Sequence, residues 1–141
     1  MDADEIKLKH LEFIQAVITR MNNCSFLIKG WSVTLVSALF ALSAKDVDIR
    51  FVLIAYFPAI VFWILDGFFL DQEKRYRQLY ALVIKNSTEI PELEMNTTSI
   101  KDLKGSWTSA IFTKTLLPFH GVVIGTILFV MFGFLIEGAT P

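Results

Sequence analysis

One run of twenty residues with a single charge constrains this chain more than any other feature. It covers residues 51–70 (FVLIAYFPAIVFWILDGFFL), and its only charge is Asp66. At the rise of an α-helix such a run is about 30 Å long, which matches the hydrocarbon core of a bilayer. The run therefore predicts a helix that spans a membrane.

The same helix is predicted to continue past the apolar run to residue 85. Residues 71–85 are charged, but Tyr76, Leu79, Tyr80 and Val83 recur at the spacing of one helical face. No Gly or Pro lies between the two halves. We expect one rod of about 50 Å, whose second half leaves the bilayer with an apolar face still to be covered.

Residues 4–22 have the pattern of an amphipathic helix, with Leu11, Ile14 and Ile18 on one stripe. Two surfaces could cover this stripe: the membrane surface, or the apolar face of residues 71–85. The second is favoured because helices that lie on membranes usually have more Lys and Arg on their polar face. Residues 22–25, which include two Asn and a Ser, are expected to end this helix and cap the next one.

Residues 25–44 form a second apolar run, and its only charge, Lys29, lies near its start. This run predicts the first span. Residues 45–50 are too few to do more than turn the chain, so the first two spans should form an antiparallel hairpin. The first span also has a face of small side chains, which allows close helix packing in lipid; its members are Thr34, Ser37, Ala38 and Ala41.

A polar linker, residues 86–114, precedes a third apolar run at residues 115–136. Gly121, Gly125 and Gly133 fall on one face of this third span, and the first two form a GxxxG pattern. Such a face favours association between subunits. Packing on the hairpin and a chance pattern are the alternatives.

Lysine and arginine are concentrated before the first span and between the second and third spans. The positive-inside rule therefore predicts a cytoplasmic N-terminus, three spans and an external C-terminus. Both amphipathic segments, 4–22 and 71–85, would then lie in the cytoplasm.

Asp66 and Lys29 should lie at nearly the same depth, each about one helical turn inside its span. An unpaired ion there costs on the order of 2–3 kcal/mol or more, so we expect an ion pair. The pair could belong to an ion pathway or gate, or it could simply fix the register of the hairpin. Trp31 and Trp63 could cover it or could anchor the spans at the interface. His120 could respond to pH or ligand, although a hydrogen-bonded bystander role is favoured.

Charge and motifs exclude several classes of function. The net charge is −1, which gives no basic field for nucleic acid, and Cys24 is the only cysteine. Arg75 and Arg77 could contact an anion, but no glycine-rich phosphate loop accompanies them. No catalytic motif, metal-ligand set or cofactor motif is recognisable, so we expect a protein that is not an enzyme.

The segments HLEFIQAVITRMNNCSFLIKGWSVTLVSALFALSA and FPAIVFWILDGFFLDQEKRYRQLY resemble small bacterial membrane proteins similar to SLATT-type transmembrane effectors of antiphage and nucleotide-signalling systems. The resemblance covers about residues 1–85 and consists of a cytosolic helix, a tight hairpin and a cytosolic continuation of the second span. It implies a homo-oligomer that permeabilises the bacterial inner membrane when a partner signals. The third span departs from the two-span plan of that class.

The expected fold is thus an all-α integral membrane protein with three spans. The expected function is an oligomeric inner-membrane effector that forms a pore or disrupts the membrane, in contact with lipids and with a soluble signalling partner. The alternative is a membrane anchor or adaptor subunit that conducts nothing. An enzyme that acts on lipids or small molecules is the least favoured class.

Overall fold

The computed structural model of the chain describes residues 2–85, 90–98 and 107–138. It contains four helices: α1 (Ala3–Asp46), α2 (Ile49–Ile84), α3 (Trp107–Ile111) and α4 (Leu116–Glu137). No strand occurs in these ranges. The all-α prediction is confirmed, and three of the helices are long and apolar enough to cross a membrane.

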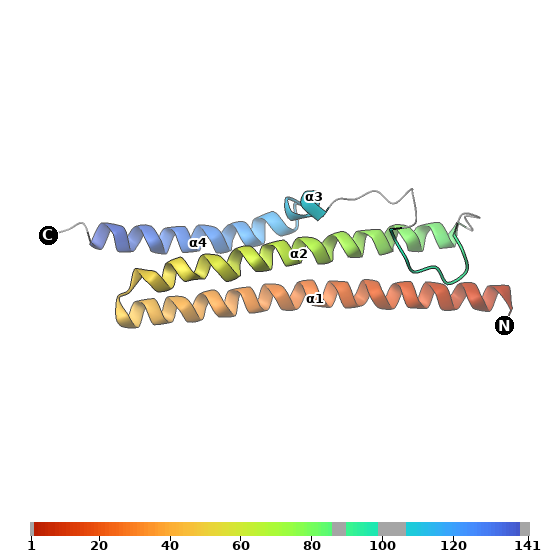
Figure 1. Cartoon of the computed structure of the whole chain (residues 1–141), viewed down its shortest axis with the longest axis horizontal. Helices are drawn as coiled ribbons and strands as arrows, with labels where there is room; N and C mark the ends of the chain where they lie inside the picture. The colour runs from red at the N-terminus through yellow and green to blue at the C-terminus, as the bar shows by residue number, and fades with distance from the viewer. Residues whose placement is uncertain (1, 86–89, 99–106, 139–141) are drawn as a thin grey trace.

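α1 and α2 form a long antiparallel pair, and Figure 1 shows them side by side over the whole length of α2. The turn between them is only Val47 and Asp48. Asp48 caps α2, since its carboxylate accepts a hydrogen bond from the backbone N–H of Arg50 at 2.9 Å. The predicted hairpin is therefore present and is closed by a very short turn.

The predicted break between residues 22 and 25 is wrong, because α1 continues through it without interruption. Asn and Ser are only modest helix formers, but propensity is a weak preference that tertiary packing overrides. Residues on both sides of this point are buried against α2, with Ile18 before it and Ser25 after it. Ser25 uses its hydroxyl to contact Asp66 on α2 instead of capping a new helix.

α2 runs as one helix through its apolar and charged halves, as predicted, and begins two residues earlier than expected. Pro58 lies inside α2 without ending it. A proline within a membrane helix is tolerated when neighbouring helices and local adjustments satisfy the freed backbone groups.

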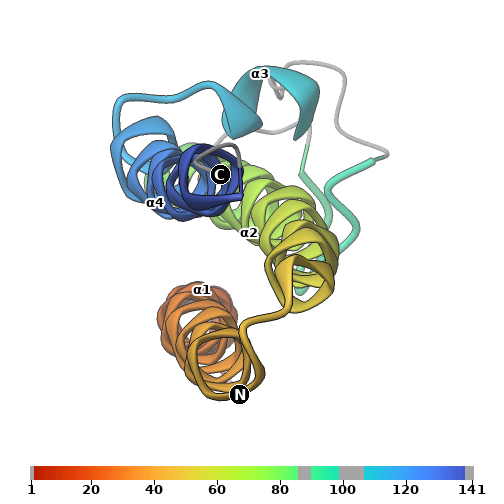
Figure 2. The same ribbon diagram turned by 90° about the vertical axis from the view of Figure 1, so that its left-hand side faces the viewer.

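α4 lies along the apolar half of α2, and the short helix α3 precedes it. Seen along the long axis in Figure 2, α2 lies between α1 and α4. The three long helices thus form a bent layer, in which α2 is the shared neighbour.

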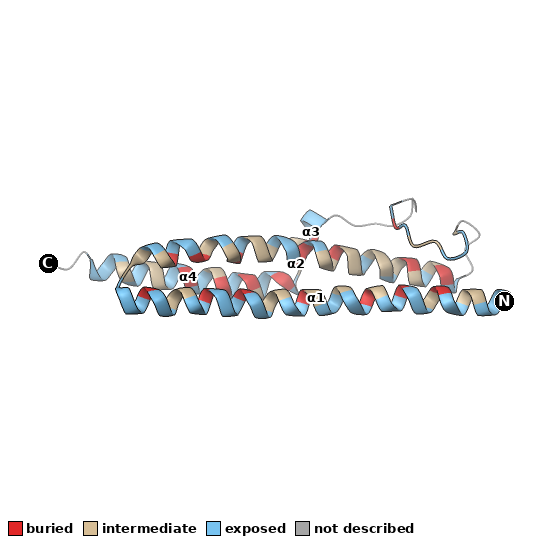
Figure 3. Ribbon diagram, turned by 60° about the horizontal axis from the view of Figure 1, so that its bottom comes forward, coloured by how far each residue is buried: buried red, intermediate tan, exposed pale blue. Residues whose placement is uncertain are grey.

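Two apolar clusters hold this layer together, and Figure 3 shows buried residues along the facing sides of the helices. The span cluster joins all three long helices and consists of Val36, Val52, Ala55, Ala59, Val123 and Ile127. The distal cluster joins the charged halves of α1 and α2 and consists of Ile14, Ile18, Leu79 and Val83. A set of buried polar side chains separates the two clusters.

Candidate functional site

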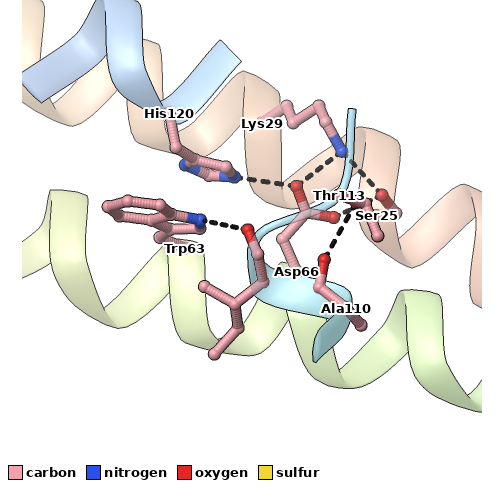
Figure 4. A network of polar contacts seen from close by, with 8 residues as sticks. Ser25, Lys29, Trp63, Asp66, Ala110, Thr113 and His120 are labelled. Carbon is pink, nitrogen blue, oxygen red and sulfur yellow. Dashed lines mark hydrogen bonds and ion pairs between the residues drawn. The ribbon is translucent and has the colours of Figure 1, made fainter. Parts of the chain in front are cut away.

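Asp66 is the centre of these buried polar side chains. It lies on α2 one turn before the apolar run ends, and its side chain is 0% exposed. A carboxylate buried this deeply is stable only when other groups satisfy its charge and its oxygens. The structure supplies those groups from both neighbouring long helices (Figure 4).

α1 contributes Lys29 and Ser25, which lie one turn apart on the same helix. The Lys29 Nζ is 2.5 Å from Asp66 Oδ2, and it also donates to the Ser25 Oγ at 2.7 Å. Ser25 Oγ in turn donates to Asp66 Oδ1. The three side chains close a ring of contacts that ties α1 to α2.

α4 contributes His120, whose side chain is 1% exposed and whose Nε2 lies 2.8 Å from Asp66 Oδ2. An ionised carboxylate accepts hydrogen bonds and donates none, so Nε2 must carry the hydrogen. The other ring nitrogen, Nδ1, is buried and has no hydrogen-bond partner among the described residues. We call Ser25, Lys29, Asp66 and His120 the polar cluster; it links α1, α2 and α4 at one point.

Aromatic rings cover the polar cluster. The indole of Trp63 stacks on the imidazole of His120 with 5.9 Å between ring centroids and 9° between ring planes. Phe119 lies edge-on to the same imidazole at 5.0 Å, and its ring centroid is 5.9 Å from Lys29 Nζ. These rings keep the ions in a low-dielectric environment, where their attraction is stronger than in water.

Trp63 also fixes α3 beside the cluster, since its Nε1–H donates to the Ile111 carbonyl at 3.1 Å. α3 can approach α2 this closely because residue 67 is a glycine. A Cβ added to Gly67 would lie 2.5 Å from Ile111 Cγ1, a separation that real atoms do not show. The absence of a side chain at Gly67 is therefore what lets α3 reach the second span.

The apolar faces expected on residues 4–22 and 71–85 lie against each other. Ile14, Ile18, Leu79 and Val83 are buried in the distal cluster, and Leu11, Tyr76 and Tyr80 pack at its edge. A loop crosses this pair, since the Glu94 carbonyl lies 2.8 Å from His10 Nε2 and the Met95 carbonyl accepts from the Tyr76 hydroxyl at 3.2 Å.

The two faces of small residues point away from the rest of the chain. The first-span face is exposed at all four positions, Thr34, Ser37, Ala38 and Ala41. Gly121, Gly125 and Gly133 on α4 are also exposed, and a Cβ added to any of them would meet nothing within 4 Å. Neither face packs the hairpin; α1 instead turns Ser25, Ser32, Val36 and Ser43 toward α2.

Arg75 and Arg77 each meet a carboxylate one turn earlier on α2. Arg75 Nε lies 2.9 Å from Asp71, and Arg77 Nε lies 2.7 Å from Glu73. The predicted anion contact would have to share these guanidinium groups with the helix's own carboxylates. Among the described residues, no three His, Cys, Asp or Glu side chains gather in a way that could hold a metal ion.

Sequence reasoning placed Lys29 beside Asp66 but did not join Ser25 or His120 to them. A usable signal was present, because His120 lies about one turn inside the third span, at the same predicted depth as the other two. Trp63, one of the two residues expected to cover the pair, does lie against the cluster by stacking on His120. The role of Gly67 depends on α3, which nothing in the polar linker predicts. Trp31 does not cover the cluster, since it is 59% exposed.

No described protein family matches this chain, and neither a curated protein nor a solved structure does.

Proposed function

We propose that this protein is an oligomeric membrane effector that forms a pore or otherwise disrupts the membrane, with antiphage defence as the setting that its resemblance implies. The observation that carries the proposal is the polar cluster. Ionisable groups inside membrane helices are costly, and where they occur they usually serve conduction, gating or signalling. Here they join side chains of all three long helices through one carboxylate.

A pore of this kind requires several copies of the chain. Three helices in a bent layer enclose no aqueous path, and in lipid every backbone group must already be satisfied within helices. The outward faces of small residues on α1 and α4 provide surfaces on which membrane helices could approach closely. In this proposal Gly121, Gly125 and Gly133 contact a neighbouring copy.

The orientation in this proposal follows from the positive residues. Lys and Arg are concentrated in the N-terminal segment and in the region between the second and third spans. The charged halves of α1 and α2 would then face the cytoplasm of a bacterium, and the C-terminus would face outward. A soluble signalling partner would reach the distal cluster from inside the cell.

The first experiment measures copy number and leakage together. The protein is reconstituted in lipid nanodiscs for native mass spectrometry and in dye-loaded vesicles for leakage. We expect an oligomer that releases dye, and Gly125→Leu should reduce both the oligomer and the leakage at least tenfold, because a leucine blocks close contact. Val122→Leu is the matched control, since Val122 is also exposed on α4 and already has a branched side chain.

A protein that stays monomeric in the nanodisc, or one that assembles without releasing dye or depolarising cells, would contradict the proposal. Equal leakage from Gly125→Leu and the parent chain would show that the glycine face of α4 is not the contact between copies. Each of these outcomes is measured on the full chain, so none depends on an isolated segment.

A second candidate function is a membrane anchor that holds a soluble protein and conducts nothing. The observation in its favour is a groove on the charged half of the helix pair, lined in part by Leu8, Leu11 and Tyr80. Leu8 and Phe13 are exposed on this half of α1, outside the apolar run of the first span. A stoichiometric complex that is lost in Leu8→Asp, with no change in membrane potential, would favour the anchor over the effector.

A further inference from the structure

The geometry points to a proton-operated exchange of partners at Asp66: when His120 gains a proton, it replaces Lys29 as the counter-ion of the carboxylate, and Lys29 moves out of the polar cluster. The exchange does not require pore formation. It decides whether Lys29 of α1 or His120 of α4 is the counter-ion of Asp66 on α2.

The first step is that two nitrogens compete for one oxygen. Lys29 Nζ lies 2.5 Å from Asp66 Oδ2, and His120 Nε2 lies 2.8 Å from the same atom. The two nitrogens come from different helices, α1 and α4, each of which packs on α2. The side chain that is the cation paired with this oxygen ties its own helix to α2: Lys29 ties α1, and a protonated His120 ties α4.

Protonation of His120 changes the net charge of the polar cluster. With a neutral imidazole the polar cluster holds one negative charge on Asp66 and one positive charge on Lys29, so its sum is zero. A proton taken from solvent binds the lone pair of His120 Nδ1, which is buried and unpartnered, and no other bond is broken. The cluster then carries one excess positive charge in a medium that solvates charge poorly.

The third step identifies the group that leaves. Asp66 is 0% exposed and His120 is 1% exposed, whereas the Lys29 side chain is 22% exposed. Lysine also has a flexible four-carbon stem that can carry its ammonium group to water or lipid headgroups. Departure of Lys29 restores a net charge of zero, with the imidazolium of His120 paired to Asp66.

Within residues 2–85, 90–98 and 107–138, Asp66 and Lys29 are the ionisable side chains that meet His120. α2 presents Asp66 and the indole of Trp63 to the imidazole, α1 presents Lys29 through the shared oxygen, and α3 has no titratable side chain in its sequence. Lys114, in the turn before α4, is exposed. When His120 gains a proton, the counter-ion of Asp66 therefore changes from Lys29 on α1 to His120 on α4.

Solid-state NMR of the full chain in lipid nanodiscs tests this exchange. Dipolar coupling between the Asp66 carboxyl carbon and the Lys29 Nζ reports their contact, and the ring nitrogen shifts of His120 report its protonation. At an alkaline pH at which the ring nitrogen shifts report a neutral imidazole, we expect a strong Lys29 coupling. At an acidic pH at which the shifts report two protonated ring nitrogens, we expect the Lys29 coupling to be lost and the His120 coupling to Asp66 to be retained.

His120→Gln is the decisive variant, because its carboxamide can still donate to Asp66 but cannot gain a proton. It should keep the Lys29 coupling at both pH values. His10→Gln removes the only other histidine and should lose the coupling on acidification as the parent chain does. If His120→Gln does not fold, the parent chain alone decides, since ring protonation and loss of the Lys29 coupling must share one midpoint.

Three results would overturn the inference: a Lys29 coupling that persists when the ring is doubly protonated, a ring that stays neutral throughout the range in which the helices persist, or a His120→Gln chain that loses the coupling as the parent does. None of these readouts involves leakage or copy number. Failure of the proposed function would therefore leave this test intact.

Discussion

The polar cluster and the distal cluster hold the same pair of helices by opposite means. Between the apolar halves of α1 and α2, a buried carboxylate with ammonium and hydroxyl partners adds a polar contact to the packing of the span cluster. Among their charged halves, the contact is made by Ile14, Ile18, Leu79 and Val83. Lipid offers no hydrophobic driving force between helices, so polar contacts and close packing must provide specificity there. Water provides that driving force, so aliphatic side chains suffice in the charged half.

The largest expected effect comes from removing the carboxylate. Asp66→Leu leaves the cationic Lys29 and the imidazole of His120 without their shared acceptor, and loss of one partner of a buried pair costs about 3–5 kcal/mol. The unfolding midpoint in mixed detergent, followed by the tryptophan fluorescence of the chain, should fall accordingly.

A double variant separates charge from packing in this result. Lys29→Met combined with Asp66→Leu should recover most of the lost stability, because no unpaired charge remains. A double variant no more stable than Asp66→Leu would mean that the carboxylate acts mainly through His120.

Leu79→Ala tests the packing of the distal cluster. Leu79 is fully buried in the distal cluster, and a Leu→Ala change in a packed core costs about 2–5 kcal/mol. Hydrogen exchange should accelerate at amides of the charged halves of α1 and α2, while α4 stays unchanged. Leu8→Ala, at an exposed position on the same half of α1, is the control. Equal acceleration in α4 would show that the two clusters unfold as one unit.

Gly67→Ala should have a smaller and more local effect. The new methyl group would collide with Ile111, and overpacking of this kind costs about 1–3 kcal/mol. We expect faster exchange at the amides of α3 and a change in the indole N–H resonance of Trp63 as its hydrogen bond to Ile111 is lost. Gly30→Ala is the matched control, because an added Cβ there meets nothing within 4 Å. An unchanged α3 in Gly67→Ala would mean that α3 is not fixed through Gly67.

The smallest expected effect lies at the hairpin turn, far from both clusters. Hydrogen bonds from the Arg50 side chain, and then from its backbone N–H, hold the pKa of the Asp48 carboxyl below its ordinary value of 3.8. A lowered pKa means that the stabilisation is present above that ordinary value and is lost as the pH falls through the lower one. The Arg50 amide should therefore exchange faster on acidification, after correction for the intrinsic rate.

Asp48→Asn should remove this dependence on pH, and Asp46→Asn at the end of α1 should leave it in place. If the Arg50 amide exchanges faster on acidification to the same extent in both variants, the pH dependence belongs to the whole turn and not to the Asp48 carboxyl.

Much of the architecture could be predicted because lipid imposes simple rules. An apolar run of the right length must be helical, a short polar connection must form a hairpin, and a charge inside a span must find a partner. These rules predicted the apolar half of α2 and led us to expect Lys29 beside Asp66, while helical periodicity predicted the continuation to residue 85, where the structure ends α2 at Ile84. They could not show which face of α4 meets α2, because nearly every residue of that helix is apolar and periodicity carries no signal.

The remaining errors have identifiable physical causes. The break expected near Asn22 rested on local propensity, which the packing of α1 on α2 overrides. Ser25 was interpreted as a cap, although a serine in an apolar helix is equally suited to serve a buried carboxylate. The contact of α3 with Gly67 depends on a long-range approach that no local pattern encodes.

The unbroken course of α1 through residues 22–25 has a mechanical consequence. A helix has a continuous ladder of backbone hydrogen bonds, so a torque applied to one end reaches the other without a joint to absorb it. α1 carries Ile14 and Lys29 on the same rod, and α2 carries Leu79 and Asp66 on its antiparallel neighbour. Any molecule that twists one helix against the other near Ile14 and Leu79 would therefore pull directly on the ion pair about four turns away.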